Sequence, residues 1–155
     1  MRSRRLLAAA VLATLGALLY AGPATAQTFD ADATGLALPT VNTTELTGAA
    51  EVPGPGDADG SGTATVITVP SHTICYVLTA TDIAPAQAAH IHEGTADMAG
   101  PVVTELAPPT LGVSGGCTTA DPTLVSELAA EPSDYYVNVH NEPYPDGAIR
   151  GQLAD

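Results

Sequence analysis

The sequence has no lysine, no tryptophan and little positive charge. Its only basic side chains apart from histidine are Arg2, Arg4, Arg5 and Arg150, against 17 acidic residues in 155 positions. The absence of lysine excludes Schiff-base chemistry. The single arginine beyond position 5 cannot form the basic patch that replaces counterions on nucleic acid, so we expect no nucleic-acid partner.

Three of the four arginines lie in the first five residues, ahead of an apolar run over 6–21 and the small residues Ala24-Thr25-Ala26. This order predicts a secretory signal peptide over 1–26, and therefore a secreted, extracellular protein. The apolar run is shorter than the roughly 20 residues that span a bilayer, so we expect no membrane span after the signal is removed. The remaining chain would be strongly acidic, with Arg150 as its one fixed cation.

Cysteine is also scarce, since only Cys75 and Cys117 are present. In an oxidising compartment an even pair is expected to form a disulfide, and the wide spacing without a CxxC motif disfavours a redox or metal pair. Such a disulfide would stabilise the fold by up to about 4 kcal/mol in the chain-entropy model.

Residues 27–40 lack periodicity and are predicted to be a flexible lead-in; the domain is expected over 41–155. Short runs rich in Thr, Val, Ile and Tyr alternate there with Gly, Pro and Asp clusters, which predicts strands joined by turns. Asp121 followed by Pro122 predicts a helix start, with the helix running to about Ala130. The fold class is therefore all-β, an antiparallel sandwich or barrel with one short helix. The predicted strands cover 62–69, 73–80, 101–106, 135–140 and 148–153.

The chain has four histidines, and two of them form the motif Ala89-His90-Ile91-His92-Glu93-Gly94. On a strand His90 and His92 share one face, so they could bind one ion while Ile91 enters the core. Imidazole is a common ligand for copper and zinc, and Glu93 could orient such a ligand. His140 ends the strand predicted over 135–140, on the face of Tyr136 and Asn138.

A structural role for these histidines is the alternative: they could hydrogen-bond to loop backbone, and His140 could bond Glu142. Arg150 could pair with a carboxylate or guide a small anion toward a metal. His72 stands alone in a predicted turn. No nucleophile elbow accompanies the serines, so we expect no hydrolase and assign no catalytic residue.

With these motifs in view, the chain resembles the CHRD domain, a module named after chordin and found in many secreted bacterial proteins. The resemblance runs from about Leu46 to Leu153. It implies an extracellular all-β module of Ig-like type without an established activity. The matching segments are LTGAAEVP at 46–53, GTAT at 62–65, AHIHEG at 89–94, GPVV at 100–103, YVNVHN at 136–141 and PDGAIRGQL at 145–153.

The chain is also loosely similar to copper/zinc superoxide dismutase, a Greek-key barrel. That similarity implies that His90, His92 and His140 stand in for three copper ligands and Arg150 for the guiding arginine. The bridging histidine and the zinc ligands of that enzyme have no counterpart in this sequence.

We therefore expect a secreted CHRD module with a non-enzymatic binding or structural role, whose partner is an extracellular protein or envelope component. The alternative is a copper-binding, superoxide-dismutase-like oxidoreductase that uses the three histidines. Convergence of the three imidazoles to within about 4–5 Å would favour the metal, since each ligand lies about 2 Å from a shared ion.

Overall fold

The computed structural model of the chain describes residues 37–154. The predicted signal peptide at 1–26 and most of the predicted lead-in at 27–40 lie outside these residues. Within 37–154, none of the helices has the length and apolar character needed to cross a membrane.

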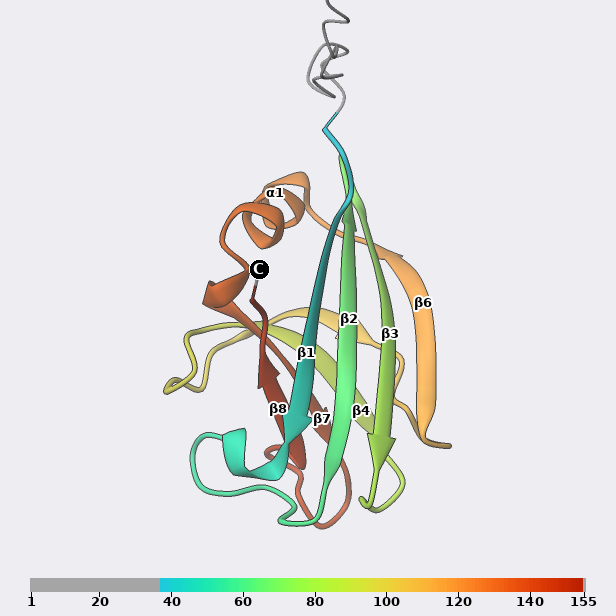
Figure 1. Cartoon of the computed structure of the whole chain (residues 1–155), viewed down its shortest axis with the longest axis vertical. Coiled ribbons are helices and arrows are strands. Elements are labelled where there is room, and N and C mark those ends of the chain that lie inside the picture. The colour runs from blue at the N-terminus through green and yellow to red at the C-terminus, as the bar shows by residue number, and fades with distance from the viewer. Residues whose placement is uncertain (1–36, 155) are drawn as a thin grey trace, which may run out of the picture. The chain divides into compact units, whose positions relative to one another are not determined.

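The described residues form one antiparallel sheet of eight strands in the order β5-β4-β7-β8-β1-β2-β3-β6. In Figure 1 the sheet curls so that β1, β2, β3 and β6 stand in front of β8, β7 and β4, with the short helix α1 at one end. The predicted all-β sandwich or barrel with one helix is confirmed. The elements are β1 (Thr40–Thr47), η2 (Gly48–Ala50), β2 (Ser61–Val69), β3 (Thr73–Thr81), β4 (Ala88–Glu93), β5 (Val102–Leu106), β6 (Val113–Thr119), α1 (Pro122–Ala130), η3 (Pro132–Asp134), β7 (Tyr135–His140) and β8 (Ile149–Gln152).

The core forms inside the curled sheet because alternate residues of each strand point inward. Ile74, Tyr76 and Leu78 share the inner face of β3, as their spacing predicts, and Ile91 enters the core from β4. Helix α1 closes one end, with Val125 and Leu128 buried. Its predicted start is confirmed, since the Asp121 side chain accepts a hydrogen bond from the Thr123 N–H at 2.8 Å.

Two strands, β1 and β6, were not predicted from the sequence. In β1 (TVNTTELT) threonines occupy both faces, and its Val41 is 61% exposed, so hydrophobic alternation is weak. Strand β6 (VSGGCTT) contains two glycines and lies at an end of the sheet, where most of its side chains are exposed. Both form because their neighbours offer an unpaired edge, a tertiary effect that outweighs local propensity.

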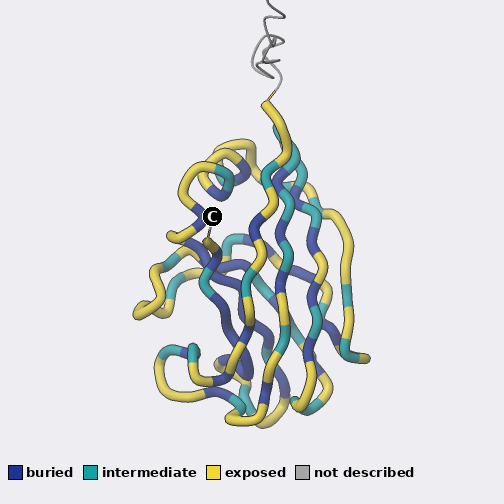
Figure 2. The backbone as a smooth tube through the Cα atoms, viewed as in Figure 1, coloured by how far each residue is buried: buried dark blue, intermediate teal, exposed yellow. Residues whose placement is uncertain are grey.

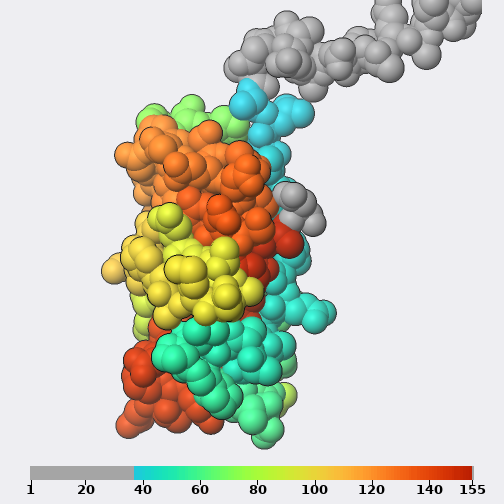
Figure 3. All heavy atoms as spheres, turned by 90° about the vertical axis from the view of Figure 1, so that its left-hand side faces the viewer, coloured from blue at the N-terminus to red at the C-terminus, as the bar shows by residue number. Residues whose placement is uncertain are grey.

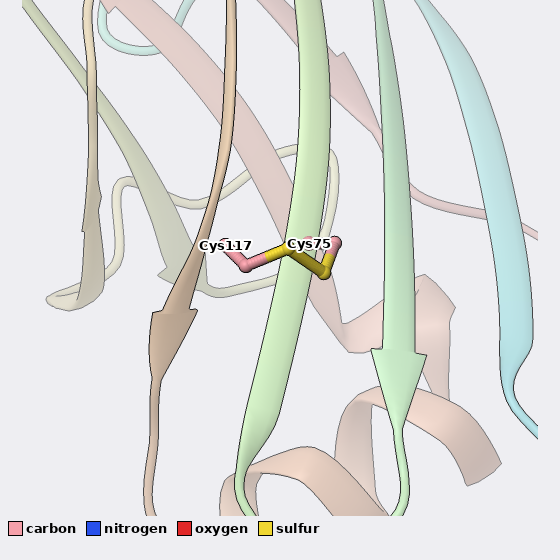
Figure 4. Close-up of a disulfide and its surroundings, with 2 residues drawn as sticks. All are labelled: Cys75 and Cys117. Atoms are coloured by element: carbon pink, nitrogen blue, oxygen red, sulfur yellow. A yellow bond between two sulfur atoms is a disulfide. The ribbon is translucent and has the colours of Figure 1, made fainter.

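The predicted disulfide is present between Cys75 of β3 and Cys117 of β6. Figure 4 shows the bridge running between the two neighbouring strands. The two cysteines are register partners on the outer face of the sheet, so the bond crosslinks β6, which ends the described sheet on one side, to the strand with which it is hydrogen-bonded.

Replacing both cysteines, as Cys75→Ser with Cys117→Ser, is expected to lower the free energy of unfolding by up to about 4 kcal/mol. The two positions lie on the outer face, so the change leaves no cavity in the core. Urea unfolding followed by circular dichroism measures the loss, and the reduced wild type should match the double variant. Equal midpoints for the oxidised wild type and the double variant would contradict this account.

Candidate metal centre

Strand β7 is buried on both of its faces along nearly its whole length (Figure 2). Val137 and Val139 point into the apolar core, whereas Tyr136 and Asn138 point outward and are still only 2% and 3% exposed. Buried polar groups need hydrogen-bonding partners, so the outer face of this strand must be covered by other polar groups.

The register of the neighbouring strands supplies part of that cover. His90 of β4 pairs with Asn138, which pairs with Arg150 of β8; His92 pairs with Tyr136, which pairs with Gln152. Two polar rows therefore run side by side across β4, β7 and β8, on the face opposite the core.

Two segments lie over these rows. Residues 94–101, which join β4 to β5, are tied down where Gln152 Nε2 donates to the Gly94 carbonyl at 2.8 Å. The segment after β1 contributes Glu51, whose carboxyl oxygens accept from Asn138 Nδ2 at 3.3 and 3.2 Å. In Figure 3, which views this side of the molecule, the two segments lie one above the other, the first in yellow and the second in green.

The three predicted histidines come together at this place. One nitrogen from each of His90, His92 and His140 lies within 4.8 Å of the other two. His90 Nδ1 and His140 Nε2 are hydrogen-bonded to each other, at 3.0 Å. His92 is 9% exposed, and the other two imidazoles are half-buried.

Backbone carbonyls fix the orientation of two of these rings. His92 Nδ1 lies 2.8 Å from the Gly100 carbonyl oxygen, and His140 Nδ1 lies 3.0 Å from that of Pro145. A carbonyl only accepts, so in both rings Nδ1 carries the proton and Nε2 keeps its lone pair. Among the residues that the structure describes, none hydrogen-bonds to His92 Nε2, which is buried.

The surroundings keep the imidazoles neutral. Burial lowers the pKa of all three histidines below the usual value. The neighbouring imidazoles lower the pKa of His90 and His140 further, and the Arg150 charge lowers that of His92. The bonds to the Gly100 and Pro145 carbonyls raise the pKa of His92 and His140, and the Asn138 side chain, Glu105 and Asp146 raise the pKa of His92, His90 and His140 respectively, but burial is the largest effect on all three. Neutral imidazole is the form that binds metal.

The arrangement suits a metal ion. Metal-binding histidines usually donate their second ring N–H to a carbonyl or carboxylate, which is what His92 and His140 do. The nitrogens left to face one another are His90 Nδ1, His92 Nε2 and His140 Nε2. The backbone bonds expected of purely structural histidines are therefore present too, with Pro145 in place of Glu142, and they aim the other nitrogen at the shared centre.

Arg150 is 1% exposed and lies over the Tyr136 ring, its guanidinium carbon 3.4 Å from the ring centroid. Nη1 donates to the Met98 carbonyl at 3.0 Å and Nη2 to the Thr95 carbonyl at 2.8 Å. The guanidinium therefore donates to backbone carbonyls of the loop. The sequence had suggested instead that it pairs with a carboxylate or guides a small anion toward a metal.

The other two residues singled out in the sequence lie elsewhere. Glu93 is exposed, pairs with Tyr135 and lines a hollow with Glu127 and Asp134, on the face of β4 opposite the imidazoles. His72 is exposed in the turn between β2 and β3.

Glu51 is the site residue that sequence reasoning missed. It follows η2 and is 7% exposed, and burial raises the pKa of its carboxyl to about 7 although the Asn138 hydrogen bond and the Arg150 charge lower it. The fold also makes room for it: a Cβ added at Gly147 would lie 2.3 Å from its Oε2. Nothing in the local sequence marks this glutamate as buried.

Because the folded-state pKa of Glu51 lies above the unfolded value of 4.5, its contribution to stability is full below pH 4.5 and is lost as the pH rises toward 7. Glu51→Gln, which stays neutral, should therefore gain stability relative to wild type between pH 4.5 and 7 and keep a constant advantage above that range. Urea unfolding at pH 4.5, 6 and 8 measures the difference. Glu45→Gln, at an exposed position of β1, is the control; a pH-independent difference for Glu51→Gln would contradict the assignment.

Comparison with known proteins identifies the family of the chain. The CHRD domain family model matches residues 42–153, which include every site residue described above. No curated protein and no solved structure matches the chain, so the similarity to superoxide dismutase rests only on the positions of the three histidines and Arg150. Because the match spans most of the sequence, the chain belongs to the CHRD domain family, a family of extracellular-type modules.

Proposed function

We propose that this protein is a secreted copper-binding module, whose ion is held by His90, His92 and His140. The observation that carries the proposal is the convergence of one nitrogen from each of three neutral imidazoles within 4.8 Å. In the metal-free structure His140 Nε2 accepts a hydrogen bond from His90 Nδ1, so an ion that binds there would displace the proton of His90 Nδ1. Ligands of one ion lie about 2 Å from it, so small rotations of these rings would bring all three within reach.

The donor set favours copper. It contains only imidazole, without thiolate or carboxylate, and imidazole suits copper and zinc, with copper(II) bound most tightly among the divalent first-row ions. The strong negative charge of the chain raises the local concentration of cations.

Holding the ion is favoured over turnover of superoxide. The only arginine of the described residues is buried and donates from both terminal nitrogens to loop carbonyls, so it does not face an arriving anion. The excess of carboxylates also repels superoxide, which is itself an anion.

Titration of the purified, tag-free protein against a copper-binding indicator tests the site, because a histidine tag would itself bind copper. Tight one-to-one copper(II) binding is expected, with weaker zinc binding. His90→Ala and His140→Ala should each weaken the copper Kd by more than the roughly 10–100-fold that losing an orienting partner costs. His72→Ala, at the exposed turn, should leave the Kd unchanged.

Copper(II) affinity weaker than millimolar in the wild type, or equal in wild type and the His90→Ala and His140→Ala variants, would end the metal proposal. Nitrogen hyperfine structure in the electron paramagnetic resonance spectrum should report three imidazoles. A superoxide assay on the copper-loaded protein then separates storage from turnover, and no rate above that of free copper is expected.

Export is the other half of the proposal. When the whole chain is expressed with a functioning secretion system, the protein should appear outside the cytoplasm with Gln27 as its first residue, because the predicted cleavage follows Ala26. N-terminal sequencing of the exported protein decides this. Retention of Arg2, Arg4 and Arg5 on the exported protein would contradict it.

A second candidate function is recognition of an extracellular or envelope partner without metal. The outer face of β1, β3 and β6 favours it, since Val41, Val77 and Val113 are 61%, 49% and 61% exposed there. The three valines lie among threonines on that face, so a partner there would contact both methyl and hydroxyl groups. Binding of that kind would survive His90→Ala and fail in a Val77→Asp variant.

A further inference from the structure

Arg150 is hydrogen-bonded to the loop between β4 and β5, which orients His92. Its guanidinium donates to the carbonyls of Thr95 and Met98, residues that are also joined by a turn in which Met98 N–H donates to the Thr95 carbonyl at 3.0 Å. A planar fork can bind two carbonyls of one turn in a fixed geometry, which a lysine ammonium cannot do. The loop conformation between β4 and β5 is thereby set by a residue of β8.

The same loop delivers the carbonyl that orients His92. Gly100 accepts from His92 Nδ1 at 2.8 Å, and its N–H donates to the Tyr136 hydroxyl at 3.0 Å. The position requires glycine, because an added Cβ would lie 1.6 Å from the Glu93 carbonyl oxygen. Gly100 is therefore held on both sides and cannot shift while the loop stays in place.

Tyr136 connects the two ends of this arrangement. Its ring stacks on His92, with centroids 4.7 Å apart and planes 11° apart, and it also contacts the Arg150 guanidinium. The imidazole, the phenol ring and the guanidinium thus form one packed unit, and the loop closes over it.

From these contacts we propose that Arg150 is a positioning residue for the metal centre. Through the loop over 95–100 and through Tyr136 it holds His92 in the tautomer that carries the proton on Nδ1 and aims Nε2 at the ion. This inference rests on the proposed copper site for its role in function, but the tautomer itself exists without metal.

The test uses metal-free, nitrogen-15-labelled protein, in which two-bond nitrogen–proton correlation spectra distinguish the histidine tautomers. In wild type, His92 should be protonated on Nδ1. In Arg150→Met, which keeps an unbranched apolar stem on Tyr136 but has no donors, His92 should become a mixture of tautomers, and the copper Kd should weaken by roughly 10–100-fold. Arg150→Lys should lie between the two, because an ammonium restores charge without the fork.

The matched control is Asn42→Ala. Asn42 is also a buried polar residue that donates to a backbone carbonyl, that of Ala154 at 3.1 Å, on strand β1. It should lower stability without changing the His92 tautomer or the copper Kd.

A folded Arg150→Met variant in which His92 keeps the Nδ1–H tautomer would overturn the inference, as would a wild type without that tautomer. If Arg150→Met fails to fold, the same criterion applies to Arg150→Lys. If the wild type does not bind copper, the proposed function is wrong. The inference about Arg150 is then decided by the tautomer measurement on the metal-free protein.

Discussion

Burial of strand β7 on both faces is the constraint on which the rest of the site depends. One face lies in the apolar core, as in any curled sheet, but the other carries Tyr136, Asn138 and His140. Side chains of this kind are normally turned to water. Here they are covered by other segments of the chain. Each of those segments must supply hydrogen-bond donors or acceptors to the buried polar groups.

Most of the hydrogen bonds between the covering segments and the polar side chains of β4, β7 and β8 are accepted by backbone carbonyls of those segments. Carbonyls of Gly100 and Pro145 accept from the imidazoles, and carbonyls of Thr95 and Met98 accept from Arg150. Glu51 is the exception, and it lies so far from water that its proton is retained up to a pH of about 7. Loop segments that supply carbonyls can tolerate variation in most of their side chains, provided that positions such as Gly100 stay small.

Sequence reasoning predicted what depends on period and spacing. The two-residue period of a strand places His90 and His92 together with Ile91 in the core, and the positions of Asp121 and Pro122 fix the helix start. It also predicted the face shared by His140 and Asn138. That His140 lies beside His90, from which it is separated by 50 residues along the chain, follows only from the pairing of β4 with β7.

The remaining parts of the site could not be found in this way. Every residue offers a carbonyl, so no pattern marks those of Thr95, Met98 and Gly100 as partners. Arg150 illustrates the problem: an isolated cation in an acidic chain suggests a carboxylate, whereas the folded loop brings two carbonyls to it. Strand β6 was missed because its pairing with β3, and not its own residues, makes it a strand.

The disulfide has a consequence for how the barrel can open. Strands β5 and β6 are the two ends of the sheet and meet without a backbone hydrogen-bonded ladder, so the barrel has a seam. The disulfide Cys75–Cys117 links β6, on one side of that seam, to β3. On the other side, β5 is hydrogen-bonded to β4, which carries two of the three histidines. Reducing agents would therefore loosen β6, which carries none of the three histidines, whereas β4 would keep its pairing with β7 and the histidine cluster would stay in place.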